Sequence, residues 1–317
     1  MGEQIKNTHQ AKGLTVDLDL GWFMDNIDAY LKEDRFQLKE FSEILGFDYR
    51  DIREADKKEE IARIIVSSSS IFFEINRDKG GAIFPEKVYR RNVNWFNQAP
   101  RQVPKVDELV LKRPMCFSLN HRFKTLNRVI LPYVFDELLS EKDKLTCANI
   151  GSGLGTDLHQ TAKAYHEKID RIINIDTDET AISLGKKEIP AEIAGKVNYY
   201  NQSLTKQKPA GENSYDLCLM IGVICPLTDS AAIAILKQIR DDVSPGGIMV
   251  VSSSTYKMHD HDPLCNINIQ ITAQWALNCR TESQLYNVID VAGFDVLEIT
   301  AEPTMYNWIA IAQKPLL

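Results

Sequence analysis

The sequence lacks the patterns that mark several common classes of protein. Its six cysteines occur singly, with no C-x-x-C pair and no histidine at the spacing of a zinc site, so neither a metal site nor a disulfide framework is expected. The longest apolar stretch, around residues 217–227, is about half of what a bilayer needs, and residues 1–10 contain no hydrophobic signal core. Basic residues are a minority, with 37 Lys and Arg against 44 Asp and Glu, and a chain of net charge −7 is repelled by phosphate backbones. These absences favour a cytoplasmic protein without a metal, membrane or nucleic-acid partner.

What is present suits a globular protein of two domains. The 317 residues exceed the size of one typical domain, and 44% hydrophobic with 26% charged residues allow a large core. Apolar residues near helical spacing predict helices over 18–31, 36–45 and 59–75, and prolines at 100, 104 and 114 indicate an irregular passage after them. We therefore expect a helical N-terminal cap over residues 1–122, which covers the site or joins two subunits into a homodimer.

The rest of the chain, residues 123–317, alternates helices with short apolar strands. This alternation predicts a doubly wound α/β fold with a mostly parallel sheet covered on both faces. Only about six residues separate the last two strands, too few for a parallel crossover, so the last strand is expected to run antiparallel to its neighbour. The predicted strands are 146–150, 171–175, 196–200, 215–221, 247–252, 295–300 and 307–313, and the predicted helices are 126–139, 156–168, 179–188, 229–242 and 282–292.

A glycine-rich turn follows the first of these strands. The segment NIGSGLGTD (149–157) has glycine at 151, 153 and 155, where the chain turns sharply and where a Cβ would collide with an approaching ligand. Asp176 ends the next strand, where a carboxylate can accept hydrogen bonds from both hydroxyls of a ribose. The glycines alone equally suit a tight turn without a ligand, and Asp176 alone equally suits a solvated strand end. Together the two features indicate a nucleoside site. The third glycine comes one place too early for G-x-G-x-x-G, so a nicotinamide dinucleotide fits less well.

At this point the chain resembles the class I S-adenosylmethionine (SAM)-dependent methyltransferases over roughly residues 123–317. The resemblance rests on NIGSGLGTD, on NIDTDE (174–179), on YDLCLMIGVICPL (215–227), on SPGG (244–247) and on the reversed last strand. It implies a Rossmann-like sheet of seven strands and SAM as the cofactor.

The resemblance also implies roles for residues around the turn. The glycines would pass beneath the methionine part of SAM, Asp176 would hold the ribose, and Met220 would lie near the sulfonium, although Met220 equally suits the core of a strand. Two positions depart from the family pattern, because Asn149 and Ser203 stand where acidic residues are usual, near the methionine ammonium group and the adenine amino group. The cofactor-binding residues implied are Asn149, Gly151, Ser152, Gly153, Gly155, Asp176, Thr177, Ser203, Leu204, Met220 and Gly222.

The methyl acceptor is expected beyond the carboxyl ends of the strands, under the cap and under the loops after the fourth and fifth strands. The long segment 255–280 contains HDHD (259–262), typical of a solvated loop, and then an apolar stripe that suits either a lid or a core-facing helix. The connector NHRF (120–123) brings a histidine and an arginine to the domain entrance, where they could face a carboxylate or lie on the surface. The catalytic candidates are therefore Tyr256, His259 and His121, and the substrate-binding candidates are Arg122, His261 and Trp275.

Methyl transfer to a small-molecule acceptor by direct in-line displacement is the leading interpretation. Transfer of the aminocarboxypropyl arm of SAM, as in nicotianamine synthase-like enzymes, is an alternative that needs only another orientation of the cofactor. A nucleic-acid methyltransferase is less favoured, because GVICPL (222–227) takes the place of an N/D-P-P-Y-type motif. A SAM-binding protein without activity is a third alternative, which the departures at positions 149 and 203 favour.

Overall fold

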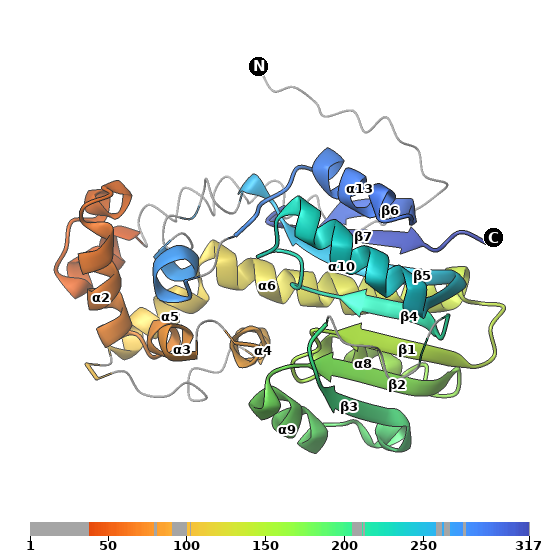
Figure 1. Cartoon of the computed structure of the whole chain (residues 1–317). Helices are drawn as coiled ribbons and strands as arrows, with labels where there is room; N and C mark the ends of the chain where they lie inside the picture. Colours follow the sequence, from red (N-terminus) through yellow and green to blue (C-terminus); the bar gives the residue numbers. More distant parts are fainter. Residues whose placement is uncertain are drawn as a thin grey trace.

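The computed structural model describes residues 38–78, 81–90, 100–101, 103–204, 211, 213–257, 262, 267–274 and 277–316. A group of helices from the first part of the chain lies beside an α/β domain, and the long helix α6 runs from one to the other (Figure 1). Before the α/β domain come a helix at 38–45, then η1 (Tyr49–Arg53), α2 (Lys58–Ser68), α3 (Ser70–Asp78), α4 (Ile83–Arg90), α5 (Pro104–Leu111) and α6 (Pro114–Thr125). Within the described ranges, none of the helices combines the length and apolar character needed to cross a bilayer.

The helix expected over 59–75 is two helices, because Ser69 interrupts it. Ser69 is extended (φ −112°, ψ 122°), and its hydroxyl accepts a hydrogen bond from the Phe72 N–H at 3.2 Å, as an N-cap of α3 does. The same hydroxyl donates to Asp107 Oδ1 at 2.6 Å, and the Ser70 N–H donates to Asp107 Oδ2 at 3.2 Å. The buried carboxylate of Asp107 on α5 therefore accepts hydrogen bonds from the first turn of α3. This contact with a residue 38 positions along the chain separates α2 from α3.

Residues 120–123, expected as a connector, are part of a long helix. α6 continues without interruption into the π-helical turn η3 (Leu126–Ile130), α7 (Leu131–Tyr133) and the π-helical turn η4 (Val134–Leu138). Pro114 starts this run at a first helical position, where the missing N–H costs nothing. The predicted start at 126 was therefore twelve residues late, and Arg122 is held on a rigid element.

The α/β domain has one seven-stranded sheet of order β3-β2-β1-β4-β5-β7-β6. β7 runs antiparallel to both β5 and β6, whereas the other pairs are parallel, which confirms the predicted fold. β5 begins earlier than predicted and includes the SPGG segment. The strands are β1 (Leu145–Ile150), β2 (Ile169–Asp176), β3 (Val197–Asn201), β4 (Tyr215–Met220), β5 (Val243–Ser254), β6 (Asp295–Ala301) and β7 (Asn307–Gln313).

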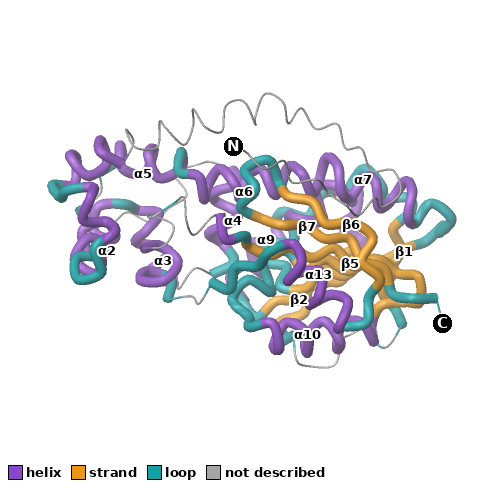
Figure 2. The backbone as a smooth tube through the Cα atoms, turned by 90° about the horizontal axis from the view of Figure 1, so that it is seen from above, coloured by secondary structure: helices purple, strands orange, loops and turns teal. Residues whose placement is uncertain are grey.

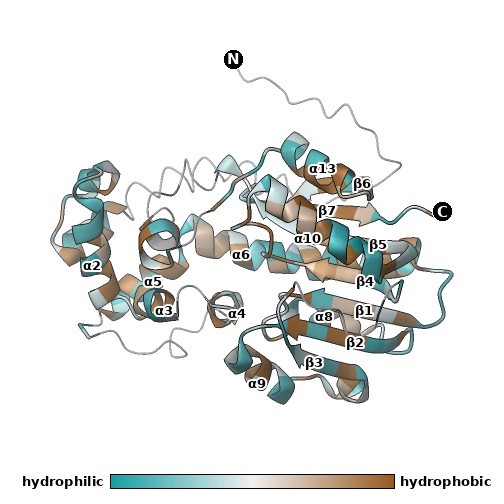
Figure 3. Cartoon of the chain, in the orientation of Figure 1, coloured by the Kyte–Doolittle hydropathy of each residue, from teal (hydrophilic) through white to brown (hydrophobic). Residues whose placement is uncertain are grey.

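Helices cover both faces of the sheet, as Figure 2 shows from above. Alternate strand residues such as Cys147 and Leu217 pack against the helical run 126–138 and against α8 (Thr156–Ala162), while their neighbours Ala148 and Cys218 pack on the other face. Figure 3 shows apolar residues gathered on these central strands. α8 ends at Ala162, before its predicted end at 168. The remaining helices are α9 (Glu179–Lys187), η5 (Ala191–Lys196), α10 (Asp229–Asp242), the π-helical η6 (Ile267–Thr272) and α13 (Glu282–Val291).

Candidate functional site

The glycine turn is tied to the end of the neighbouring strand. Gly151, Gly153 and Gly155 have φ angles of +65°, +53° and +86°, which side chains rarely adopt. The Gly151 N–H donates to the Ile175 carbonyl at 2.8 Å, and the Gly153 N–H donates to Asp176 Oδ2 at 2.7 Å. The turn is thus fixed between the carboxyl ends of β1 and β2.

The three glycines meet different neighbours. A Cβ on Gly151 would lie 2.6 Å from Val223 Cγ2, and one on Gly153 would lie 3.2 Å from the Ala82 Cβ. A Cβ on Gly155 would instead meet His159 Cε1 at 2.6 Å. Gly151 and Gly153 therefore border the space below the cap, whereas Gly155 permits tight packing inside the α/β domain.

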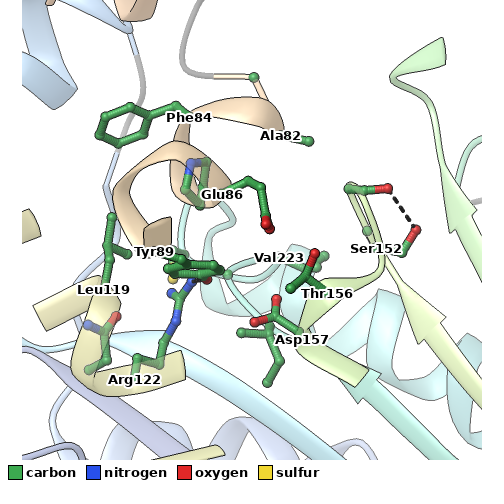
Figure 4. A pocket seen from close by; sticks show the side chains of 18 of the residues that line it. Ala82, Phe84, Glu86, Tyr89, Leu119, Arg122, Ser152, Thr156, Asp157 and Val223 are labelled. Carbon is green, nitrogen blue, oxygen red and sulfur yellow. Dashed lines mark hydrogen bonds between the residues drawn. The ribbon is translucent and has the colours of Figure 1, made fainter. Parts of the chain in front are cut away.

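That space is a cavity of about 330 Å³ between the cap and the carboxyl ends of the strands. Its walls come from α3, α4 and α6, from the glycine turn, from the loop after β4 and from Ala273 and Leu277 (Figure 4). Most of the surface is apolar. Apolar lining residues include Ile75, Phe84, Met115, Leu119, Val223, Ala273 and Leu277, and polar ones are Glu86, Tyr89, Arg122, Ser152, Thr156, Asp157, Ser254 and Asn307.

One corner of the cavity concentrates charge. Arg122 on α6 is 5% exposed, and its Nη2 donates to the Tyr89 hydroxyl on α4 at 2.9 Å. Asp157, at the start of α8, lies next to these two side chains, and Glu86 lies one turn of α4 before Tyr89 (Figure 4). We call Tyr89, Arg122 and Asp157 the polar corner.

Burial perturbs the ionisation of these groups. It raises the pKa of Asp157 to about 6, against the opposing effects of the Arg122 charge and the Tyr89 hydroxyl, and the Glu86 charge adds to the increase. Burial also raises the pKa of Tyr89, which stays neutral. For Arg122, burial alone would lower the pKa, but Tyr89 and Asp157 together raise it, so the guanidinium stays charged.

Among the residues that the structure describes, two polar atoms in this corner have no hydrogen-bond partner. They are Arg122 Nε, a donor, and Asp157 Oδ1, an acceptor, and both are shielded from solvent. Asn149 Nδ2, behind the glycine turn at a residue 1% exposed, also has none. Native proteins pair nearly all such atoms, so unpaired ones at a cavity indicate a ligand-binding surface.

Several residues predicted for the cofactor gather at this cavity or at its edge. Gly151, Ser152, Gly153 and Gly222 line it. Asp176 lies just beyond, with Oδ1 accepting from the Asp178 N–H at 2.9 Å as well as Oδ2 from Gly153. Others lie away from the lining: Thr177 is exposed, Ser203 and Leu204 are half-buried, Met220 is fully buried among the strands, and Gly155 and Asn149 are behind the turn.

The two catalytic candidates that the structure describes, His121 and Tyr256, are not among the residues lining the cavity. The His121 ring packs tilted against Phe117 at a centroid distance of 4.3 Å, and the adjacent Arg122 does line the cavity. Tyr256 is 48% exposed. His259, His261 and Trp275 lie outside the described residues.

The HDHD run is anchored at its last residue, unlike the solvated loop expected. Asp262 is fully buried and pairs with Arg113 Nη2 at 2.6 Å, and its Oδ2 accepts from the Met115 N–H at 3.2 Å. The following segment packs Ile267 and Ile271 against the cap core. The described part of the apolar stripe therefore faces a core, while Ala273 and Leu277 reach the cavity.

The loop after β4, which borders the cavity at 221–226, is held by Arg280. Arg280 is 1% exposed, and its guanidinium donates to the carbonyls of Ile224 at 3.0 Å and Leu227 at 2.6 Å. The Gly222 N–H donates to the Ser252 hydroxyl at 2.8 Å. These bonds fix the loop after β4, which borders the cavity beside the glycine turn.

Sequence reasoning missed Tyr89, Glu86 and Asp157. Asp157 ends the NIGSGLGTD motif, so the motif contained a signal for it. Tyr89 and Glu86 had none, because only the packing of α4 over the glycine turn brings them to the site.

A family model of AdoMet-dependent proline di-methyltransferases matches residues 124–306, more than half of the chain. The chain belongs to this family. This methyltransferase therefore uses SAM as its cofactor, as its resemblance to the class I enzymes implied. A comparison with curated proteins finds no match.

Solved structures are similar to this methyltransferase, and the first of the two below shares its fold. A possible exported protein from Bordetella parapertussis is 17% identical, with a TM-score of 0.60 over 92% of this chain and 97% of that chain. The magnesium protoporphyrin IX methyltransferase from Synechocystis PCC 6803, with bound SAM, is 13% identical, with a TM-score of 0.49 over 78% and 97% of the two chains.

Proposed function

We propose that this methyltransferase moves the methyl group of SAM to a small-molecule acceptor in the cavity under the cap. The observation that carries the proposal is the cavity itself, which has about 330 Å³, mostly apolar walls and one polar corner. Such a site suits a small ligand held by a few polar contacts. The net charge of −7 also argues against a nucleic-acid acceptor.

The residues around the glycine turn fit the cofactor. Gly151 and Gly153 border the cavity without a side chain, and Asn149 Nδ2, which has no partner among the described residues, lies behind them. Each oxygen of Asp176 already accepts one backbone hydrogen bond and retains a second lone pair for a ribose hydroxyl. Gly155 keeps the turn closed. Ser152 and Gly222 would border the reacting end of SAM, with Met220 behind them in the strand, and Thr177, Ser203 and Leu204 would border the adenine.

When bound, SAM supplies a methyl group already activated by its positive sulfur. The chain then has to position the acceptor and keep water out. Phe84, Leu119 and Leu277 from three separate segments form apolar walls for this purpose. The Arg280 hydrogen bonds hold the loop after β4, so the wall that this loop forms keeps its shape.

The family description directs attention to proline as an acceptor. Its ring nitrogen is a secondary amine that is protonated at neutral pH, so a base must take its proton before methylation. Tyr256, His259 and His121 are our candidates for that role, and Arg122, His261 and Trp275 for acceptor contact. Alanine variants of each, assayed for the rate of methyl transfer, test these assignments one at a time.

Incubation of the full chain with methyl-labelled SAM tests the function. The acceptors are L-proline, a peptide beginning with proline, and a small-molecule extract, and the mass search looks for a gain of one or two methyl groups. We expect methylation in L-proline or the extract, with S-adenosylhomocysteine (SAH) as the second product. Methylthioadenosine as the product would establish aminocarboxypropyl transfer instead, and labelling of macromolecules alone would contradict a small-molecule acceptor.

Binding provides a separate test of the cofactor site. We expect micromolar affinity for SAM, about −8 kcal/mol in binding free energy. The Asp176→Ala variant should lose most of this affinity, and unchanged binding would show that the ribose lies elsewhere.

A further inference from the structure

The antiparallel last strand brings a polar side chain to the edge of the sheet where the cavity lies. β5 ends at Ser254 and β7 begins at Asn307, and these two residues are paired across the strands. Both line the cavity, and they are 3% and 1% exposed. In the sheet order, β7 lies three strand spacings from β1, which is roughly 14 Å from the strand that carries the glycine turn. Asn307 therefore borders the part of the cavity that lies away from the glycine turn.

The Asn307 amide is oriented by a chain of hydrogen bonds behind it. Its Nδ2 donates to Ser118 Oγ on α6 at 2.5 Å, and the Ser118 hydroxyl donates to Glu302 Oε1 at 3.0 Å. Glu302 Oε1 also accepts from the backbone N–H groups of Tyr306 at 2.8 Å and Asn307 at 3.1 Å. Because this oxygen is an acceptor, the single proton of the Ser118 hydroxyl points to it. Ser118 Oγ is then left to accept, so Asn307 must face it with its NH2 group and not with its carbonyl.

The carbonyl oxygen of the Asn307 amide is left for the cavity. Ser118 and Glu302 are fully buried, so water does not replace either of them in the chain of hydrogen bonds. Asn307 Oδ1 makes no hydrogen bond to any residue that the structure describes, although the side chain is buried. A buried carbonyl without a donor costs free energy, which a ligand with a donor recovers. The neighbouring Ser254 hydroxyl can rotate to donate or accept, so only Asn307 distinguishes the two kinds of ligand.

We propose that Asn307 Oδ1 selects the methyl acceptor by accepting a hydrogen bond from its N–H or O–H group, and that Ser118 and Glu302 are positioning residues that hold the amide in this orientation. The inference rests on the proposed function, in which the acceptor enters this cavity. A ketone, ether or thioether at the same point brings a lone pair against Oδ1 and leaves it without a donor, so such a group binds more weakly. The substrate class is therefore an amine or an alcohol.

Three cyclohexane derivatives of nearly equal size probe this selection in the full chain saturated with SAH. Cyclohexylamine presents an ammonium group, cyclohexanol presents a hydroxyl, and cyclohexanone presents only an acceptor. NMR titration, observed on the probe, gives the affinity of each. We expect the amine or the alcohol to bind the wild type at least tenfold more tightly than the ketone, which is about 1.4 kcal/mol. The tighter of the two then shows whether the site suits an amine or an alcohol.

Variants of Asn307 and Ser118 separate the contact from its positioning. Asn307→Leu removes the amide at similar volume and should abolish the preference for the amine or the alcohol. Ser118→Ala keeps the amide but frees it to turn Nδ2 to the cavity, so the ketone should gain affinity and the preference should fall. Ser118→Thr retains a hydroxyl and should keep the preference. A purely structural role of Ser118 would instead weaken all three probes together.

Ser42→Ala is the matched control. Ser42 is a buried serine of the helix at 38–45 whose hydroxyl donates to the Lys39 carbonyl at 2.9 Å, and it does not line the cavity. This variant should bind all three probes as the wild type does. Calorimetry with SAH shows which variants are folded, and if Asn307→Leu does not fold, the comparison of Ser118→Ala with Ser118→Thr decides.

The titrations can overturn the proposal in two ways. A wild type that binds none of the probes, or binds the ketone as tightly as the amine and the alcohol, contradicts the contact at Asn307. A Ser118→Ala variant that keeps the wild-type preference, or loses affinity for all probes equally, contradicts the positioning.

The same data keep this inference separate from the proposed function. The titrations involve no methyl transfer, so their failure leaves the labelled-SAM assay to decide the reaction. Conversely, a protein with the expected preference that methylates no small molecule retains the subsite and loses the proposed function.

Discussion

Replacing Gly151 by alanine should damage the site through two separable effects. The first effect is backbone strain, because the φ angle of Gly151 is +65° and an L-residue in this left-handed conformation costs about 1–2 kcal/mol. The second is contact, because the new Cβ would lie 2.6 Å from Val223 Cγ2, and overpacking of this kind costs about 1–3 kcal/mol. We therefore expect Gly151→Ala to lower the free energy of unfolding by about 2–5 kcal/mol.

A double-mutant cycle separates the two effects. Val223→Ala removes the methyl group that the new Cβ meets, so in this background Gly151→Ala should retain only the cost of the backbone. Val223 also lines the cavity, and we expect Gly151→Ala to weaken SAH binding at least tenfold, with partial recovery in the double variant. The assays are urea unfolding and calorimetry.

Gly293→Ala is the matched control. Gly293 has a φ of +90°, and its Cβ would lie 2.9 Å from Arg240 Nε, but neither residue lines the cavity. It should lose at least the backbone part of the stability while the folded fraction binds SAH as the wild type does. Equal losses of affinity in the two glycine variants, or no coupling between Gly151→Ala and Val223→Ala, would refute the reasoning.

Three further outcomes are expected. The pKa of Asp157 is about 6 in the folded chain against an ordinary 3.8, so the folded state binds more protons between these values and its stability falls as pH rises through this window. Asp157→Asn should therefore gain up to about 3 kcal/mol at pH 8 and little at pH 4 in urea unfolding, and a loss at pH 8 would contradict this. Arg280→Lys, which cannot reach both loop carbonyls, should lower the free energy of unfolding by about 2–4 kcal/mol and weaken SAH binding; undiminished stability would speak against its role. Ser69→Ala removes the cap of α3 and its bond to Asp107, and a loss below about 0.5 kcal/mol would show that the helix break has another cause.

Local signals were sufficient for the sheet. The central strands are buried on both faces and therefore appear as short apolar runs such as residues 217–220 and 248–251, bounded by glycine, proline or polar residues. The six residues at 301–306 excluded a parallel connection to the last strand, and β7 is antiparallel. Each of these inferences needed only neighbouring residues.

The errors arose where distant residues decide local structure. The helix over 59–75 breaks at Ser69 because Asp107 satisfies the first turn of α3. The connector at 120–123 is helical because α6 continues into the sheet domain. Asp262 in the HDHD run is buried because Arg113 pairs with it across 149 residues.

The polar corner could not be assembled from the sequence for the same reason. Arg122 was a candidate together with its neighbour His121, because an expected connector at 120–123 does not distinguish which of the two side chains faces the site. Tyr89 reaches Arg122 only through the packing of α4 on α6, and nothing in EKVYR (86–90) indicates that contact. Sequence patterns located the glycine turn, whereas tertiary packing determined which side chains face it.

A crystal structure of the full chain with SAH bound tests the central claim most directly. We predict SAH in the cavity below the cap, against Gly151 and Gly153, with its ribose hydroxyls on Asp176. Density for SAH at any other place, with this cavity empty, would contradict the account.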